Sequence, residues 1–175
     1  MNQFPCQRLL FCILALAASG AGLVAQCTRT WTVGSLPGAN NRVTCAIEWD
    51  ADGAGPAPAR LVVGGYFTAI GAVATRGIAI YDDVSGQWGP LGTGIQGGVD
   101  ALAAMPNGDL IAGGGFAIAG GTIVNNVARW NGSTWTGLGS GTDSGVTALA
   151  VLPSGDLVAG GLFSNAGGSL VNRVA

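Results

Sequence analysis

The chain repeats itself, and the length of the repeat restricts its fold more than any other feature. The segment Gly98–Phe116 aligns without a gap with Gly145–Phe163, at an offset of 47 residues. A looser copy, Leu61–Phe67, aligns with Leu110–Phe116 at an offset of 49 residues. A period of about 47 to 50 residues is typical of propeller blades rather than of helical solenoids. We therefore expect blades that stack against one another and bury apolar strands between them.

Residue types within one repeat predict four short strands. The apolar stretch Val99–Met105 and the stretch that begins at Leu110 are the first two, with turn residues between them. Asn126–Trp130 and Thr134–Leu138 are the third and fourth. They are joined by Asn131-Gly132, a dipeptide that favours the positive φ angles of a tight hairpin turn. The sequence thus predicts an all-β chain of tandem four-stranded antiparallel blades, the strand number of a propeller blade.

Three copies of this unit follow one another along the chain. Trp31, Trp88 and Trp135 open them, and the first copy carries an insertion, Asp50–Ala59, where the others have a tight turn. The predicted repeat region covers 26–175, with blades at about 31–87, 88–134 and 135–175. The third copy reaches Ala175 before the counterpart of its last strand, so we expect a partial propeller of about two and a half to three blades.

A closed propeller has about four to eight blades. We therefore expect this chain to be part of a longer protein, because open sheet edges promote aggregation. Assembly of blades between chains, and an open solenoid-like stack with exposed ends, are the alternatives.

The positions that define the repeat are small or aromatic. A glycine pair lets neighbouring backbones approach closely, and an aromatic residue follows the pair. Tryptophan is large enough to fill gaps between blades, and we favour this packing over sugar stacking because the tryptophans recur at equivalent positions. The repeat-defining residues are Gly64, Gly65, Phe67, Gly113, Gly114, Phe116, Gly160, Gly161, Phe163, Trp88, Trp130 and Trp135.

Composition excludes several classes of function. Apolar residues make up 49% of the chain and charged residues 9%, which is not the composition of a disordered protein. The chain has no Lys, and its net charge of −2 leaves no basic surface for nucleic acid. It also has no His, which removes the commonest general base and the commonest metal ligand.

Acidic residues are the remaining candidates for chemistry. Asp109 and Asp156 occupy equivalent turns, where one carboxylate per turn is too few for a calcium loop and suits turn stabilisation instead. Asp82-Asp83 is the densest acidic spot, but adjacent carboxylates in a hairpin loop usually point apart into solvent. Gly113–Gly115 lacks the lysine and helix of a phosphate loop. We therefore predict no catalytic residue, cofactor site or metal site.

The N-terminal residues 1–25 have the pattern of a signal peptide. Arg8 is the only charge, the apolar run Leu9–Ala18 follows, and Ala25 supplies a small residue for cleavage. An uncleaved membrane anchor is the alternative. After cleavage only Cys27 and Cys45 remain, and an oxidising compartment would allow a disulfide between them; two unpaired, packed thiols are the other interpretation.

Two stretches carry a resemblance to known families: GGGFAIAGGTIVNNVARWNGSTW at 113–135 and GGLFSNAGGSLVNRVA at 160–175. They resemble the kelch-type repeats of secreted bacterial proteins and are also similar to the fungal cortical polarity-marker family. The resemblance covers about 31–175 and implies four-stranded blades in a propeller. It does not imply one activity, because propellers host many functions.

We therefore expect a secreted or cell-surface module that acts in binding or structural interaction, with a protein or a glycan as partner and no catalysis of its own. We expect no nucleic acid as partner and no membrane contact beyond the signal segment, whereas assembly with further repeats is consistent with the partial propeller. The alternative is the N-terminal portion of a larger secreted enzyme, glycan-active or oxidase-like, whose catalytic residues lie beyond residue 175.

Overall fold

The computed structural model describes residues 38–53 and 55–175, which form strands and turns. The predicted signal peptide, 1–25, lies outside the described residues, as do Cys27 and Trp31. No helix of the described part is long and apolar enough to cross a membrane.

The first sheet has four antiparallel strands, in the order β1-β2-β5-β6. They are β1 (Val43–Trp49), β2 (Arg60–Gly65), β5 (Ile78–Asp82) and β6 (Gln87–Pro90). The insertion that the sequence places at Asp50–Ala59 joins β1 to β2.

The second sheet repeats this arrangement, in the order β7-β8-β10-β11. Its strands are β7 (Ile95–Ala104), β8 (Leu110–Ala119), β10 (Val127–Trp130) and β11 (Trp135–Gly137). The third sheet consists of β12 (Val146–Val151) and β13 (Leu157–Gly161), and a bridge between Gly160 and Val174 adds the beginning of a third strand position. The predicted fold class, partial four-stranded blades of an all-β propeller, is confirmed.

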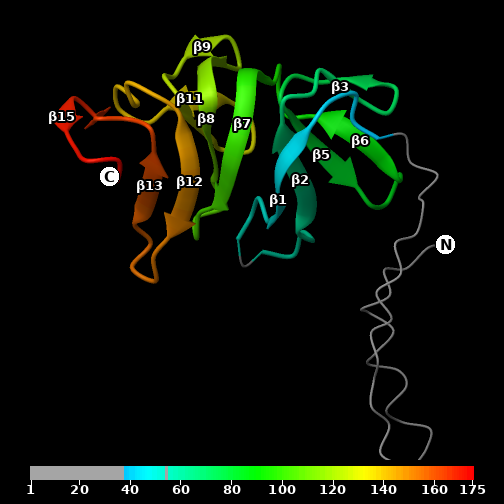
Figure 1. The fold of residues 1–175 in the computed structure, drawn as a ribbon. Coiled ribbons are helices and arrows are strands. Elements are labelled where there is room, and N and C mark those ends of the chain that lie inside the picture. Colours follow the sequence, from blue (N-terminus) through cyan, green and yellow to red (C-terminus); the bar gives the residue numbers. More distant parts are fainter. Residues whose placement is uncertain (1–37, 54) are drawn as a thin grey trace, which may run out of the picture. The chain divides into compact units, whose positions relative to one another are not determined.

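A short hairpin follows the second strand of each sheet. The hairpins are β3 (Ala69–Ile70) with β4 (Val73–Ala74), the end of β8 with β9 (Thr122–Ile123), and β14 (Asn165–Ala166) with β15 (Ser169–Leu170). We call the first strand of each sheet, β1, β7 and β12, its inner strand. The hairpins lie at the end of the sheets where these inner strands begin (Figure 1).

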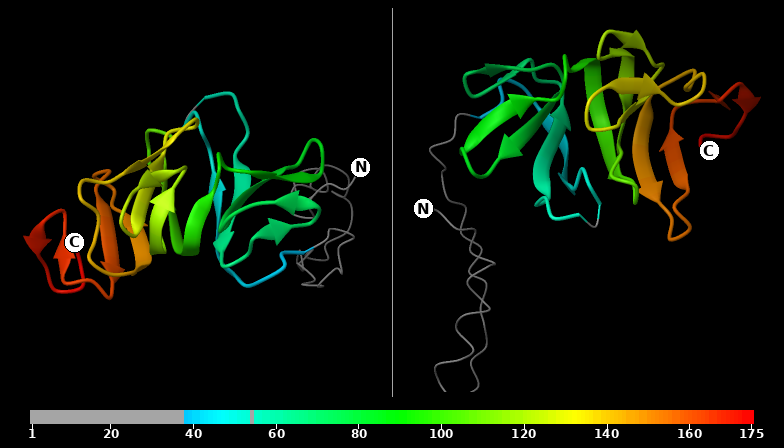
Figure 2. Two further views of the ribbon diagram at one scale, coloured as in Figure 1. Left: turned by 90° about the horizontal axis from the view of Figure 1, so that it is seen from above. Right: turned by 180° about the vertical axis from the view of Figure 1, so that it is seen from behind.

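The three sheets stand side by side in chain order, as both further views also show (Figures 1 and 2). The inner strand β7 contacts β1 on one side and β12 on the other. The joint between the first and second sheets is called the first joint below, and that between the second and third sheets the second joint.

The sheet boundaries fall later than the repeat boundaries set at Trp88 and Trp135. Trp88 lies in β6 and pairs with Tyr81 of β5, and Trp135 lies in β11 and pairs with Trp130 of β10. Trp88 and Trp135 therefore each lie on the outermost strand of the preceding sheet. A period in sequence is the same wherever counting begins, whereas a sheet boundary depends on which strands exchange hydrogen bonds.

The first glycine of each pair makes room for the next sheet. A Cβ atom on Gly64 would lie 2.7 Å from Cγ1 of Val99 in β7, and one on Gly113 would lie 2.7 Å from Cγ1 of Val146 in β12. Both valines are 0% exposed. We call the glycine of this contact the cradle and the valine the knob. Any side chain on the cradle would push the neighbouring sheet away.

The second glycine of each pair is required within its own sheet. A Cβ atom on Gly65, Gly114 or Gly161 would collide with a main-chain carbonyl oxygen of the inner strand or of the residues just before it. The inner strand carries a bulge at this point in all three sheets, between Val43 and Cys45 in the first. The aromatic residues of the motif, Phe67, Phe116 and Phe163, are buried.

Two of the three repeat-defining tryptophans lie in the largest core cluster. Trp130 and Trp135 are buried with ring centroids 5.3 Å apart, and Nε1 of Trp135 donates to the carbonyl oxygen of Leu91 at 3.1 Å. Trp88 is half-buried, with its ring 5.1 Å from that of Tyr81. These rings contact protein, which leaves Trp88 as the most accessible of the three.

Cys45 has no disulfide partner among the described residues, and its predicted partner Cys27 lies outside them. The Cys45 side chain is half-buried at the first joint, close to the cradle Gly64 and the knob Val99. Burial raises the pKa of the Cys45 thiol, so the reactive thiolate is scarce at neutral pH.

Candidate functional site

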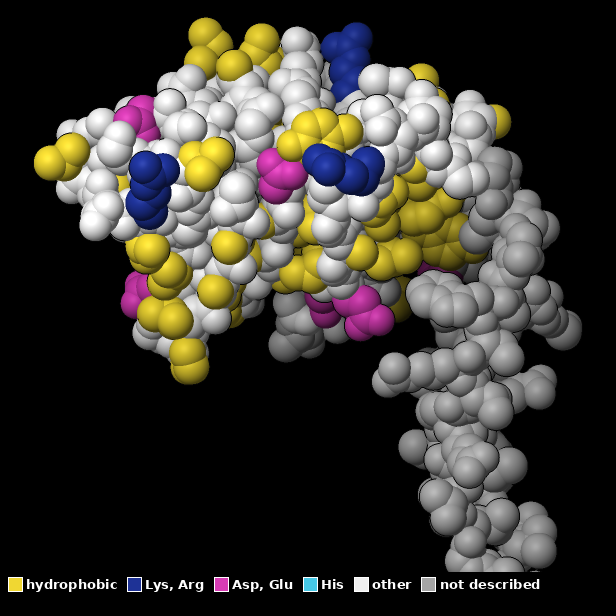
Figure 3. Space-filling view, in the orientation of Figure 1, with side chains coloured by type: hydrophobic (Ala, Val, Ile, Leu, Met, Phe, Trp, Pro, Cys, Tyr) yellow, Lys and Arg dark blue, Asp and Glu magenta, His cyan; other side chains and the backbone are white. Residues whose placement is uncertain are grey.

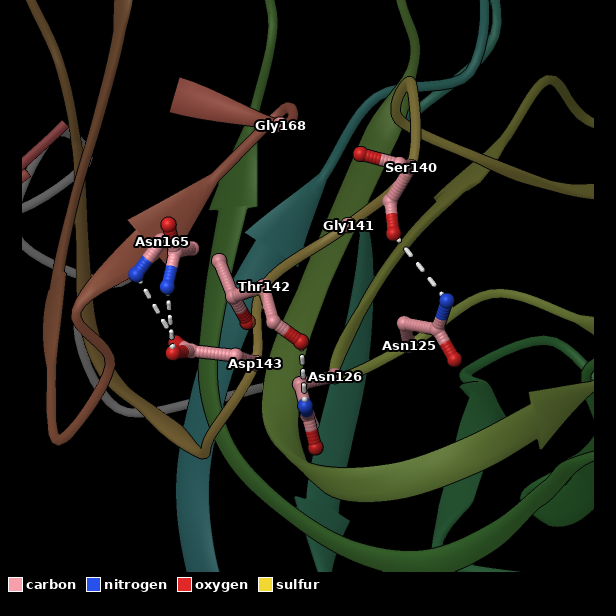
Figure 4. A pocket seen from close by; sticks show the side chains of 8 residues that line it. All are labelled: Asn125, Asn126, Ser140, Gly141, Thr142, Asp143, Asn165 and Gly168. Carbon is pink, nitrogen blue, oxygen red and sulfur yellow. Dashed lines mark hydrogen bonds between the residues drawn. The ribbon is translucent and has the colours of Figure 1, made fainter. Parts of the chain in front are cut away.

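Two open hollows occupy equivalent places, one at each joint, at the end where the inner strands begin. The first has a volume of about 680 Å³ and includes Tyr66, Arg76, Gly77 and Gln96. The second has a volume of about 410 Å³ and is lined by Asn125, Asn126, Ser140, Gly141, Thr142, Asp143, Asn165 and Gly168 (Figure 4). Arg76-Gly77 and Asn125-Asn126 are counterparts in the repeat, so equivalent positions present different side chains to the two hollows.

The main chain at the second hollow is held in a left-handed conformation. Asn125 and Asn126 have φ angles of 49° and 69°, a region that asparagine tolerates better than most residues. The N–H of Asn126 donates to the carbonyl oxygen of Phe116 at 2.6 Å, and its own carbonyl accepts from the N–H of Gly114 at 3.0 Å. The repeat motif therefore fixes the main chain at Asn126, whereas the left-handed φ of Asn125 is not shared by its counterpart Arg76.

Both amide groups bind the loop that leads into β12. Nδ2 of Asn126 donates to the carbonyl oxygen of Thr142 at 2.9 Å, and Nδ2 of Asn125 donates to that of Ser140 at 3.0 Å (Figure 4). The two asparagines thus clamp the second sheet to the start of the third. Each amide donates one of its two N–H groups in this way, and its carbonyl oxygen and second N–H have no partner among the described residues.

Asp143 is held by four hydrogen bonds. Its Oδ1 accepts the main-chain N–H groups of Ser164 at 2.8 Å and Asn165 at 2.9 Å. Its Oδ2 accepts the Ser164 hydroxyl at 3.0 Å and Nδ2 of Asn165 at 2.9 Å. These donors, those of Asn165 foremost, hold the pKa of Asp143 far below its ordinary value. A carboxylate so firmly ionised orders the β14–β15 hairpin and is a poor general base.

Unpaired hydrogen-bond acceptors gather in the second hollow, each beside the second N–H of its own amide. The side-chain oxygens of Asn125, Asn126 and Asn165 receive no hydrogen bond from any described residue, and the Ser140 hydroxyl makes none with them. An open surface of neutral acceptors with amide N–H groups beside them suits a ligand rich in hydroxyl groups, which can both donate and accept.

The first hollow is different in character. Tyr66 is 40% exposed, and its hydroxyl donates to Oδ1 of Asp100 at 3.0 Å. The guanidinium carbon of Arg42 lies 4.5 Å from the centre of the Tyr66 ring, a cation–π contact. Burial and the Asp100 carboxylate raise the pKa of Tyr66, so this side chain remains a neutral phenol in physiological conditions. The aromatic ring is therefore already occupied on one face by arginine.

The acidic residues that the sequence singled out lie in turns or next to them, and none lines either hollow. Oδ1 of Asp82 accepts the N–H groups of Val84 at 2.9 Å and Ser85 at 3.2 Å, and these bonds lower the pKa of Asp82. Asp109 accepts Nδ2 of Asn107 at 2.8 Å, and Asp156 accepts the Ser154 hydroxyl at 2.7 Å.

These contacts are of the turn-stabilising kind. Within residues 38–53 and 55–175, no three Cys, Asp or Glu side chains lie close enough to hold a metal ion together.

Sequence reasoning missed the residues that line the second hollow. Asn125-Asn126 was visible as a pair of residues that favour left-handed backbone, placed where the preceding repeat has Arg76-Gly77. The partners of these residues could not be found in this way, because Asp143 lies in an irregular loop and Asn165 begins the short hairpin strand β14.

The fold and the two hollows define an array of propeller blades whose loops differ from joint to joint, an interaction or structural module. Residues 54–151 match the Rax2 C-terminal beta propeller domain. This match covers more than half of the chain, which therefore belongs to that family of non-catalytic propeller domains. The predicted similarity to the fungal polarity-marker family is confirmed. No curated protein and no solved structure gives a significant match to the chain.

Proposed function

We propose that this chain is a non-catalytic binding module of the cell exterior that recognises a glycan at the second joint. The observation that carries the proposal is the cluster of unused acceptors in the second hollow, the side-chain oxygens of Asn125, Asn126 and Asn165 beside the Ser140 hydroxyl. Sugar hydroxyl groups are the natural donors to such a cluster, because they are numerous, neutral and adaptable in direction. A protein ligand would use the same acceptors through its N–H groups.

Two sequence features support a location outside the cytoplasm: the predicted signal peptide at 1–25 and the resemblance to kelch-type repeats of secreted bacterial proteins. Such a location would allow a disulfide between Cys27 and Cys45, with two unpaired thiols as the alternative. Thiol titration of the secreted, unreduced and unfolded protein tests the pairing. No reactive thiol is expected in the processed chain, whereas two would contradict a Cys27–Cys45 bond.

The binding proposal is tested by NMR titration of the processed chain with a panel of neutral oligosaccharides. We expect shifts of the side-chain amide signals of Asn125, Asn126 and Asn165. Ser140→Leu, which fills an exposed position of the hollow and breaks no recorded hydrogen bond, should abolish them. Thr136→Ala, an exposed change on β11, is the matched control and should bind as the natural chain does. Shifts that survive Ser140→Leu, or no shifts with any oligosaccharide, would contradict a glycan site here.

A further inference from the structure

The chain carries a third knob and a third cradle that do not meet. Inside the chain each joint seats one knob on one cradle, Val99 on Gly64 and Val146 on Gly113. The knob always lies opposite the second glycine of its own sheet, just before the bulge: Val99 opposite Gly114, and Val146 opposite Gly161. The same register identifies the corresponding knob of the first sheet and the corresponding cradle of the third sheet, each on the face that turns away from the second sheet.

Val43 is the unmatched knob. It lies opposite Gly65 and precedes the bulge of β1, which is the register of the other two valines. Its exposed fraction is 43%, whereas Val99 and Val146 are 0% exposed. An apolar side chain that is buried at two of three equivalent positions is thus left in solvent at the third.

Gly160 is the unmatched cradle. It lies opposite Ala148, as Gly113 lies opposite Ala101. The nearest atoms to a Cβ on Gly160 are Cβ of Ala148 at 3.8 Å and the carbonyl oxygen of Arg173 at 3.9 Å, both from the same repeat. Among the described residues no knob reaches it.

The sheet face around Gly160 is apolar, like the face that is covered at the second joint. Ala148, Ala150, Leu152 and Val158 lie on it, with Leu152 44% exposed. Their counterparts on the second sheet are Ala101, Ala103, Met105 and Ile111, of which all but the half-buried Met105 are buried. Figure 3 shows hydrophobic side chains gathered over the β12–β13 hairpin at the lower left of the molecule. The composition of a blade joint is therefore present there without its second half.

A threonine hydroxyl occupies the same position in the first and third sheets, whereas the second sheet has Asp100 there. At the first joint the Thr44 hydroxyl donates to the carbonyl oxygens of Gly64, at 3.2 Å, and of the knob Val99. Thr147 is its counterpart in the third sheet and donates to the carbonyl oxygen of Gly160 at 3.4 Å. A knob seated on Gly160 would find the same donor for its carbonyl oxygen.

We propose that a second copy of this chain docks on the open face of β12 and β13, with Val43 of one copy seated on Gly160 of the other. The interface continues the two joints already present, since it uses the knob and cradle positions of both and the hydroxyl position of the first. Each copy keeps one knob and one cradle, so a head-to-tail contact whose rotation closes joins two copies through two equal joints in a ring. Glu48 is the polar exception on β1, at the position that Ala104 and Val151 occupy in the other inner strands.

The test is the mass of the processed chain, residues 26–175, in sedimentation over a dilution series. The natural chain should give twice the mass of one copy. Val43→Arg places a charge on the knob, and Gly160→Val fills the cradle; each should weaken association by about tenfold or more. Both sites are open in one copy, so thermal melting should show folded protein in each variant. Val84→Arg, at another exposed valine, is the matched control and should associate as the natural chain does.

Mixing the two variants identifies the joint. The Val43→Arg copy keeps its cradle and the Gly160→Val copy keeps its knob, so an equal mixture should regain one joint and form a heterodimer. A self-complementary contact of one face with itself would not be rescued in this way. A natural chain that stays monomeric, a mixture that stays monomeric, or growth beyond two copies would overturn the proposal.

Discussion

The two joints share their main-chain contacts and differ in the side chains that tie them. Both seat a valine on a glycine, and at both an N–H that follows the inter-sheet loop donates to the preceding sheet: Ile95 to Arg76 at 2.7 Å, and Thr142 to Asn125 at 3.0 Å. At the first joint a further bond, from Nε1 of Trp49 to the carbonyl oxygen of Gly108 at 2.8 Å, closes the far end of the inner strands. The second joint is closed at the opposite end.

At that opposite end the amides of Asn125 and Asn126 provide the ties of the second joint, where the first has Arg76 and Gly77. Conversely, the counterpart of Trp49 at the second joint is Met105, which has no N–H to donate. The contrast shows that the two joints share the knob, the cradle and the main-chain contacts, whereas the further side-chain bonds differ from one joint to the other. Loop residues are then free to vary, and the hollows that could bind a ligand differ accordingly.

The largest effect is expected where the backbone geometry itself is broken. Gly114→Ala brings a Cβ atom against the carbonyl oxygen of Gly98, which belongs to the main chain and cannot rotate away. We expect the free energy of unfolding to fall by about 3 kcal/mol. Gly115→Ala is the matched control, because a Cβ there meets nothing within 4 Å, and it should change stability by less than about 0.5 kcal/mol. Chemical denaturation measures both, and equal losses would show that the pair of glycines is not the constraint.

Truncation of the knobs tests whether the two joints are equivalent. Val99→Ala and Val146→Ala each remove two methyl groups from a fully buried contact and should cost about 2 kcal/mol in unfolding free energy. Val43→Ala, made in the Gly160→Val background so that self-association does not contribute, should cost less than about 0.5 kcal/mol. Losses at Val99 and Val146 that differ by more than about 1 kcal/mol would break the comparison.

The sequence predicted the blades far better than the hollows, and the reason is physical. Strand positions, turns and the glycine pair recur at fixed spacing, and a contact that recurs leaves a periodic signal. The sheet boundaries were displaced because Trp88 recurs as regularly as Gly64 does, and a period has no natural starting point. Asp143 gave no signal, since its partners Ser164 and Asn165 depend on how one loop meets the next.

Loss of the indole bond should have a smaller effect than truncation of a knob, and it should be confined to the first joint. Trp49→Phe keeps an aromatic ring but leaves the carbonyl oxygen of Gly108 without its donor, so we expect a loss of about 1 kcal/mol in unfolding free energy. Trp88→Phe is the matched control, because Trp88 is half-buried and its indole N–H makes no recorded bond within the described residues. Denaturation curves that do not distinguish the two variants would show that the bond contributes nothing to the first joint.

The smallest effect should be a dependence on pH that one loop has and its counterpart lacks. Asp143 and Asn40 have the same role: each accepts two main-chain N–H groups at the start of a short hairpin, in Asn40 those of Thr68 and Ala69. The pKa of Asp143 is lowered in the folded chain, so its stabilisation is fully present above the ordinary aspartate value of about 3.9 and is lost as the pH falls toward the folded value.

Reciprocal substitution separates this titration from that of the other carboxylates. Below about pH 4, the melting temperature should depend less on pH in Asp143→Asn and more on pH in Asn40→Asp than it does in the natural chain. Both changes should be small because both positions are exposed. At neutral pH Asp143→Asn should be slightly less stable than the natural chain, since Nδ2 of Asn165 then loses its charged acceptor. The opposite outcome is that the melting temperatures of both variants change with pH as that of the natural chain does. In that outcome the hydrogen bonds of Asp143 do not control its ionisation, and the two loops are equivalent in charge as well as in geometry.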